Sequence, residues 1–259
     1  MTSLSRNARA LAAGLALLSC PILPAAAEST SAGTRPDALE FRMRGELRDE
    51  YVDHRQGGGS NMLVPRLDYA VTPAISVRVE APLVTSGPEL AGESNQSGFG
   101  DLLFRGSFRV SRGPGYALVV GAEALLDTAS KDSLGYGKQV LAPLVYASIE
   151  VPRCRSVLFP FAQRFFTVGG DASRPDVDYT LLKAAMLTRW PDRLYTVVEP
   201  QVVVDHERSD RVGAMLEVEA GRFLDRRTTI FARPGIGLHG GDLPQAYDWN
   251  FKVGVRYSF

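Results

Sequence analysis

The chain has 259 residues, and its 29 Lys and Arg side chains are balanced by 29 Asp and Glu side chains. A neutral chain of this kind gives no reason to expect a nucleic acid as a partner. After the N-terminal leader, no segment stays apolar for the ~20 residues that a membrane-spanning helix needs, which excludes a helical membrane protein.

The first residues are typical of an export signal. Arg6 and Arg9 form a basic start, residues 11–23 form an apolar stretch, and three alanines at 25–27 form a small-residue cleavage site. Cys20 offers an alternative, lipoprotein-type processing site, although Pro21 and the better site at 25–27 favour ordinary cleavage.

Three parts of the chain follow from this reading. We expect a secretory signal peptide over residues 1–27, a flexible periplasmic leader over residues 28–37, and a single β-barrel domain over residues 38–259. The leader is predicted to be flexible because its residues are small and polar.

Apolar and polar residues alternate with a period of two along most of the remaining chain. Successive side chains of a strand point to opposite faces, so this alternation predicts strands, and no segment has a convincing helical period. The predicted fold class is therefore all-β, with about twelve strands at residues 41–48, 63–71, 75–83, 102–110, 118–127, 140–150, 157–168, 179–190, 194–205, 212–223, 229–238 and 247–259.

The links between these strands alternate in length. The longer, Gly-rich or polar links are at 53–60, 86–97, 128–138, 169–178, 206–211 and 239–246, and the shorter ones are at 72–74, 111–115, 151–156, 191–193 and 224–227. Bacterial outer-membrane barrels have long extracellular loops, short periplasmic turns and an even number of strands. The pattern predicts a single antiparallel up-and-down barrel in the outer membrane of a Gram-negative bacterium, with both termini periplasmic.

The charged residues of the strands share one face, and the opposite face is almost continuously apolar. Burying so many charges in a dry core would be very costly, whereas a wet lumen solvates them and lipid covers the apolar face. We predict that these charges line the lumen, and the candidates are Arg42, Arg44, Glu46, Arg48, Glu50, Arg66, Asp68, Arg78, Glu80, Asp101, Arg105, Arg109, Glu123, Asp127, Lys183, Glu199, Glu217, Glu219, Arg233, Lys252 and Arg256.

Two interpretations of this lining remain open. The charges form a selectivity lining in an open pore, or neighbouring Arg and Glu pair across strands and close a narrow lumen. If the pore is open, the arginines of the first four strands predict a weak anion preference. Replacing both Arg44 and Arg48 by Glu should then reverse that preference.

Strand 157–168 has two polar residues in succession, Gln163 and Arg164, so one of them must face lipid unless a bulge resets the register. Arginine at the membrane midplane costs about 2–4 kcal/mol, and we therefore expect Arg164 to face inward. Aromatic residues predicted to form girdles at the membrane interfaces are Phe41, Tyr69, Phe108, Trp190, Trp249, Tyr257 and Phe259.

The last predicted strand is apolar or aromatic at every second position and ends on an aromatic residue. It resembles the closing strand of bacterial outer-membrane barrels, which implies recognition by the barrel-assembly machinery. The residues of this predicted assembly signal are Phe251, Val253, Val255, Tyr257 and Phe259.

Three short motifs resemble those of a known family. Residues 66–83 resemble a hairpin whose second strand ends in Pro-Leu, residues 97–101 (Ser-Gly-Phe-Gly-Asp) resemble a strand opening, and residues 135–137 resemble a later Gly-x-Gly. They are similar to the outer-membrane barrel proteins associated with meta-pathway phenol degradation, often described as transporters. Thr72-Pro73 departs from the usual turn, and Ala70 replaces a glycine. The resemblance implies a channel, with aromatic compounds as the solutes.

Two other functions remain as alternatives to a channel for small solutes. An outer-membrane hydrolase acting on lipid would need a histidine base, and only His54, His206 and His239 exist, all in predicted loops. A closed structural or adhesive barrel is the third possibility.

No metal site or cofactor is expected. The acidic residues that gather in predicted loops, Asp171, Asp176 and Asp178 in one and Glu89 and Glu93 in another, are too few for a hard-cation site.

Overall fold

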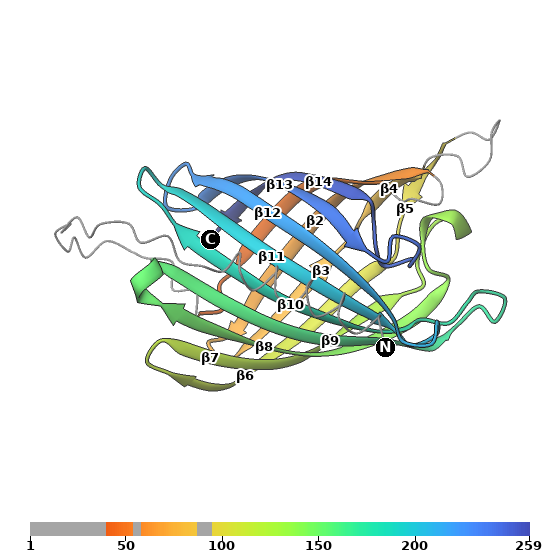
Figure 1. Cartoon of the computed structure of the whole chain (residues 1–259), viewed down its shortest axis with the longest axis horizontal. Helices are drawn as coiled ribbons and strands as arrows, with labels where there is room; N and C mark the ends of the chain where they lie inside the picture. The colour runs from red at the N-terminus through yellow and green to blue at the C-terminus, as the bar shows by residue number, and fades with distance from the viewer. Residues whose placement is uncertain (1–39, 54–57, 87–94) are drawn as a thin grey trace, which may run out of the picture.

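The computed structural model describes residues 40–53, 58–86 and 95–259, which form one antiparallel sheet that closes on itself (Figure 1). Closure is made by the first strand, β1, which pairs with β2 on one side and with the last strand, β14, on the other. The expected signal peptide and leader lie outside the described residues.

Twelve barrel strands make up the ring, as the alternation predicts. The sheet has fourteen segments because two barrel strands are interrupted, one between β3 and β4 at residues 81–82 and one between β5 and β6 at residues 100–101. The segments are β1 (Arg44–Asp53), β2 (Gly59–Thr72), β3 (Ile75–Glu80), β4 (Leu83–Ser86), β5 (Gln96–Phe99), β6 (Leu102–Gly113), β7 (Tyr116–Leu126), β8 (Lys138–Val151), β9 (Ser156–Gly170), β10 (Asp178–Arg189), β11 (Leu194–Asp205), β12 (Arg211–Phe223), β13 (Thr228–His239) and β14 (Trp249–Ser258). Two single-turn 3₁₀ helices, η1 (Asp132–Leu134) and η2 (Pro152–Cys154), lie in the links.

The links sort by length onto the two ends of the barrel, which we call the turn end and the loop end. At the turn end, Thr72 Oγ1 accepts hydrogen bonds from the amides of Ala74 and Ile75 and closes the tight β2–β3 turn. Both chain ends of the barrel lie here, since the amide of Phe259 donates to the carbonyl of Met43 at 3.1 Å. The longer links are gathered at the loop end.

The outer face of the barrel is apolar. On β14, Phe251, Val253, Val255 and Tyr257 are each about two-fifths exposed on this face, while the side chains between them point inward. A closed sheet pairs all of its backbone donors and acceptors, which is what hydrocarbon requires of a spanning structure. None of the described residues belongs to a helix that is long and apolar enough to cross a membrane.

Three expectations are wrong in detail. The first strand begins at Arg44 rather than at residue 41, and Phe41 lines the lumen instead of an outer girdle. Gln163 faces inward, with its side-chain amide donating to the carbonyl of Ala142, so Arg164 faces outward. Arg164 lies near the loop end and pairs with Asp178, and there the cost of a lipid-facing charge is small.

Candidate functional site

The lumen contains a belt of ion pairs at mid-height. Glu46 on β1 lies 3.1 Å from Arg48 and 2.5 Å from Arg256 of the neighbouring β14. Arg48 also contacts Glu50 at 3.3 Å and Glu80 on β3 at 2.8 Å. Every second residue of a strand faces the lumen, so two adjacent strands present alternating charges directly to each other.

A second group of ion pairs continues the belt across β11 to β14. Glu217 forms ion pairs with Arg233 at 2.5 Å and with Lys252 at 3.1 Å. Glu219, which is fully buried, accepts from Arg256 at 2.5 Å and from the Tyr195 hydroxyl at 2.7 Å. Here the carboxylates and the cations balance, and each carboxylate has several donors.

The charges do not balance on the adjoining part of the ring, from β1 to β6, where we define an arginine wall as Arg44, Arg66, Arg78, Arg105 and Arg109. A single carboxylate, Asp68, is shared by three of these arginines, Arg44 at 3.1 Å, Arg66 at 2.7 Å and Arg78 at 2.6 Å. Glu123 is the principal partner of Arg105. The arginine wall therefore carries excess positive charge.

The loop half of the lumen is filled by apolar side chains that we call the apolar plug. Tyr179 stacks on Phe165 from the next strand, with ring centroids 4.4 Å apart. Three members, at positions 243, 246 and 247, come from the β13–β14 link, which folds into the mouth of the barrel. The plug consists of Val52, Val140, Ala142, Phe165, Tyr179, Val203, Met215, Leu243, Ala246 and Tyr247.

The plug is fixed to the ion-pair belt by two hydrogen bonds. The Tyr247 hydroxyl donates to Glu217 at 3.1 Å, and the Asn250 side-chain amide donates to the same oxygen at 2.7 Å. Burial, and then the Glu217 carboxylate, raise the pKa of Tyr247, so the phenol stays protonated and remains a donor. Gly240 allows the link to bend inward. Its φ of +70° is a conformation that other residues rarely adopt, and its close approach to the backbone of Gly213 leaves no room for a side chain.

A second link at the loop end is held by Asp101. Its two carboxylate oxygens accept from the backbone amides of Thr128 at 3.1 Å, Ala129 at 3.0 Å and Tyr136 at 2.7 Å. This carboxylate faces the lumen as predicted, but its oxygens are engaged by the β7–β8 link. Its role in this structure is to anchor that link.

Three adjacent cavities run along the lumen. The turn-end cavity has a volume of about 440 Å³ and shares Arg44, Arg78 and Arg105 with a mid-lumen cavity of about 500 Å³. The mid-lumen cavity shares Arg48 and Glu80 with a loop-end cavity of about 360 Å³. This third cavity lies beside the plug, beneath the β7–β8 link. At the loop end, the open space is therefore displaced from the barrel axis toward that link.

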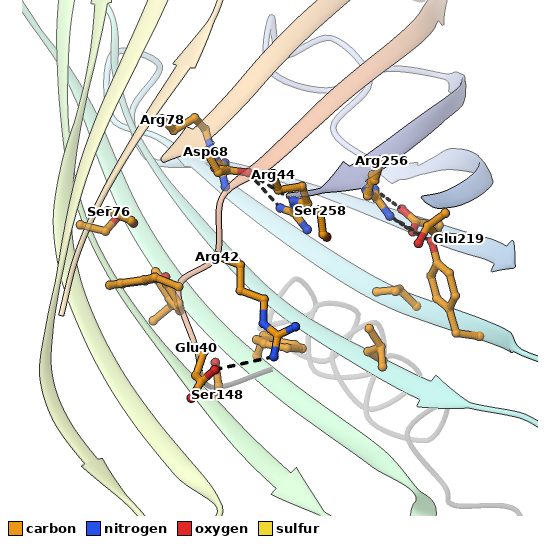
Figure 2. Close-up of a pocket in the computed structure, with 18 of the residues that line it drawn as sticks. Glu40, Arg42, Arg44, Asp68, Ser76, Arg78, Ser148, Glu219, Arg256 and Ser258 are labelled. Carbon is orange, nitrogen blue, oxygen red and sulfur yellow. Dashed lines mark hydrogen bonds and ion pairs between the residues drawn. The ribbon is translucent and has the colours of Figure 1, made fainter. Parts of the chain in front are cut away.

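Figure 2 shows how the chain before β1 enters the turn-end cavity. Arg42 projects into the space and pairs with Glu40 at 3.6 Å, while Arg44, Asp68 and Arg78 lie to one side and Arg256 with Glu219 to the other. The Phe41 ring lies under the Arg109 guanidinium, 4.9 Å from its centre. Arg42 thus reaches the lumen from outside the strands, whereas Asp127, another residue predicted to line the lumen, is exposed just beyond the end of β7.

The loop histidines and acids have separate partners. His54, Glu89 and Glu93 lie outside the described residues, and His239 is exposed at the end of β13. Asp176 pairs with Lys138 and Asp178 with Arg164, while Asp171 accepts from Ser173, whose backbone amide lowers the pKa of that carboxyl. In the part of the chain that the structure describes, no three His, Cys, Asp or Glu side chains gather as metal ligands would.

The His206 imidazole lies between a strand hydroxyl and a loop carboxylate. Its Nε2 lies 2.9 Å from Thr180 Oγ1 and its Nδ1 lies 2.6 Å from Asp210, so that hydroxyl, imidazole and carboxylate form a chain. Thr180 follows the inward-facing Tyr179 and is therefore on the outer face, directly across from Arg164 in the β9–β10 register. Ser209, three residues after His206 in the sequence, is not part of this chain.

No protein-family description and no curated protein matches this chain in sequence. Solved structures do match it in fold. One is the COG4313 outer membrane channel from Pseudomonas putida F1, with a TM-score of 0.66, 11% identity, and coverage of 88% of this chain and 100% of that one.

Two porins match as well. NanC porin has a TM-score of 0.61 at 6% identity, covering 83% of this chain and 100% of that one. KdgM porin in complex with disordered oligogalacturonate has a TM-score of 0.57 at 12% identity, covering 83% and 99%. The closed ring, the apolar outer face and the charged lumen define the class of this protein, a transmembrane β-barrel with the fold of porin-like outer-membrane channels.

Proposed function

We propose that this protein is an outer-membrane channel that passes small solutes through its charged lumen. The observation that carries the proposal is the series of three adjacent cavities from the turn end to the loop end, lined at mid-height by charged side chains. Rings of charge in a wet passage select among ions and polar solutes. The excess charge of the arginine wall gives the passage a preference for anions.

Conductance of the refolded mature protein in a planar bilayer, measured across a salt gradient, tests this function. Stable current steps with a reversal potential on the anion-selective side are expected. A folded, heat-modifiable barrel that gives no current would show that the ion pairs and the plug close the lumen, and the channel function would then be wrong.

The cellular setting belongs to the same proposal. The chain is exported, cleaved after Ala27 and inserted by the barrel-assembly machinery through its last strand, with both termini periplasmic. Deleting Phe259 should lower the amount of heat-modifiable barrel in outer-membrane fractions, because the terminal aromatic is the predicted recognition element. The proposal that the solutes are aromatic compounds depends on the family resemblance alone. The direct measurement is whether adding such a compound reduces the ionic current through the barrel.

A lipid hydrolase is retained as a second candidate because of the chain that joins Thr180, His206 and Asp210. In hydrolases, the nucleophilic hydroxyl donates to a histidine base, and a carboxylate orients that histidine. Thr180, His206 and Asp210 have this arrangement. Arg164, across from Thr180, offers a positive charge for a developing oxyanion. The group faces outward near the loop end, at the level of the outer lipid leaflet.

Release of fatty acid from phospholipid vesicles containing the protein tests this second candidate. Activity that is lost in both Thr180→Ala and His206→Ala, and retained in the matched variant His239→Ala, would support it. Fatty-acid release no greater than that of vesicles without protein would refute the hydrolase. Release that is equal in all three variants would refute it as well.

A further inference from the structure

The turn-end cavity has two chemically different sides. On one side lie three members of the arginine wall, Arg44, Arg78 and Arg105. The other side is an apolar wall, which we define by the five inward-facing residues that line the same cavity on consecutive strands from β7 to β11. They are Val119, Tyr146, Phe159, Leu187 and Val197.

Two of these arginines lie across the lumen from the apolar wall. In the ring of twelve strands, β1 and β9 are six barrel strands apart in either direction, as are β3 and β11, so Arg44 is opposite Phe159 and Arg78 is opposite Val197, whereas Arg105 is on β6, the neighbour of β7. A molecule that fills the cavity therefore meets the guanidinium groups of Arg44 and Arg78 on one side, and on the other a surface that is hydrocarbon or aromatic apart from Ser148 on β8 and Arg189 on β10.

The arginine wall has donors to spare. Asp68 is shared by three arginines, and the further carboxylates of Arg66 and Arg78 lie beyond hydrogen-bond distance, Glu46 at 3.9 Å from Arg66 and Glu80 at 3.8 Å and 4.0 Å from Arg66 and Arg78. Each guanidinium has five N–H donors, so the two oxygens of Asp68 cannot accept from all of them. Arg109 lies beside the cavity rather than on its lining, with buried Nε and Nη2 atoms that have no hydrogen-bond partner among the described residues and its guanidinium 4.9 Å from the centre of the Phe41 ring. A guanidinium N–H without an acceptor is costly, and an anion bound at Arg44, Arg78 and Arg105 would supply acceptors to the members that do line the cavity.

The chain itself already places such chemistry in the cavity. The Glu40 carboxylate lies 3.6 Å from both Arg42 and Arg112, and the adjacent Phe41 ring packs on Arg109. The Glu40 carboxylate (Figure 2) and the Phe41 ring thus both line the turn-end cavity.

We propose that the turn-end cavity is a binding site for an amphipathic monocarboxylate, with its carboxylate on the arginine wall and its apolar body on the apolar wall. This proposal rests on the proposed channel function for its biological meaning, but the binding itself does not require conduction. Charge alone does not define the ligand, because the apolar wall discriminates against small hydrophilic anions.

The experiment is a calorimetric titration of the protein in lipid nanodiscs with hexanoate, from which the heat for empty nanodiscs is subtracted. Acetate carries the charge without the apolar body, and hexanol carries the apolar body without the charge. Hexanoate should bind at least about tenfold more tightly than either.

Variants of the two walls separate this site from general partitioning. Arg78→Gln with Arg105→Gln should weaken hexanoate binding about tenfold or more, and Phe159→Ser with Val197→Ser should reduce the preference for hexanoate over acetate. Arg153→Gln, an exposed arginine outside the cavity, is the matched control. Glu40→Gln removes the internal carboxylate and should strengthen binding, a gain that misfolding cannot produce.

The outcomes distinguish the site from the channel. Binding that follows these variants in a barrel without conductance would support the site and refute the channel, whereas conductance without preferential hexanoate binding would refute the site alone. Equal affinities for hexanoate, acetate and hexanol, or wall variants that bind like Arg153→Gln, would overturn the proposal.

Discussion

The two halves of this lumen are built in opposite ways. The loop half is packed like the core of a soluble protein, with Leu243 and Val203 almost completely buried in the apolar plug. The turn half holds most of the charged groups and the larger cavities, and its arginines share too few carboxylates. The same alternating strands supply both halves, so the difference comes from which residues occupy the inward positions.

For the proposed channel, this comparison predicts that one end of the lumen sets the barrier and the other sets the selection. A close-packed apolar segment excludes water and therefore opposes the passage of ions, as hydrophobic constrictions do in channels. The charged half stays hydrated and attracts or repels the solute before it reaches the barrier. The loop-end cavity beside the plug is the narrow route between the two.

The largest effect is expected from opening the plug. Replacing Leu243 by Ser, together with Tyr247 by Ser, removes two side chains from the plug and places hydroxyl groups where water can join them. Single-channel conductance should rise several-fold, because the dry segment becomes hydrated.

A matched variant on the outer face separates this effect from a general loss of packing. Leu238 is exposed on the outer face of β13, next to the same link, and Leu238→Ser should leave conductance unchanged. A plug variant that folds and conducts no better than wild type would show that the barrier lies in the charged half instead.

The next effect is a change of selectivity from the arginine wall. Arg44→Gln with Arg78→Gln removes two positive charges that share the single carboxylate of Asp68 with Arg66, and the reversal potential should move toward cation preference. This pair is sharper than the reversal of Arg44 and Arg48, since Arg48 lies among Glu46, Glu50 and Glu80 and its loss would leave three carboxylates together.

Arg227→Gln, at the mouth rather than in the wall, is the control for a general surface-charge effect. A conducting double variant with the reversal potential of wild type would show that the arginine wall does not select ions.

A smaller effect is expected where the two halves are joined. Glu217→Gln keeps the size of the side chain but weakens the hydrogen bonds and ion pairs that Tyr247, Asn250, Arg233 and Lys252 make with it. Leaving such partners under-satisfied costs about 1–3 kcal/mol, so the barrel should unfold at a lower temperature in a heat-modifiability assay. Equal unfolding temperatures would show that the belt does not support the plug.

Most of the fold could be predicted from the sequence because its signal repeats in every strand. A period of two assigns each residue to the lumen or to lipid, and the alternating link lengths assign each link to one end. Alternation points the side chains of Glu46 and Arg256 into the lumen, and closure of the ring places β1 beside β14. Ion pairs such as Glu46 with Arg256 follow from these two features together. The interruptions at 81–82 and 100–101 did not change the strand count.

The plug could not be predicted in the same way, because its decisive residues come from a link. Leu243, Ala246 and Tyr247 have no period of two, and nothing local shows that their link folds inward. The inward positions of Val140, Ala142 and Val203 are a signal that was available, since apolar residues on both faces of a strand indicate a dry interior. The parity of Arg164 does not follow from the cost of a charge at midplane depth, because this residue pairs with Asp178 toward the loop end, where an outward charge costs little.

The smallest effect concerns the second link at the loop end and tests whether the mouth depends on the plug alone. Asp101→Asn replaces one accepting oxygen by a donor that faces the backbone amides of Thr128, Ala129 and Tyr136. The loss of about one hydrogen bond, worth roughly 1 kcal/mol, should loosen the β7–β8 link without unfolding the ring. Limited proteolysis should then cut within 129–136 faster than in Asp127→Asn, an exposed neighbour that makes none of these bonds. The loop-end cavity lies beneath this link, so conductance shows whether the link is part of the barrier. Faster proteolysis with unchanged conductance would show that the plug alone forms the barrier. Faster proteolysis together with higher conductance would show that the β7–β8 link and the β13–β14 link form the barrier together.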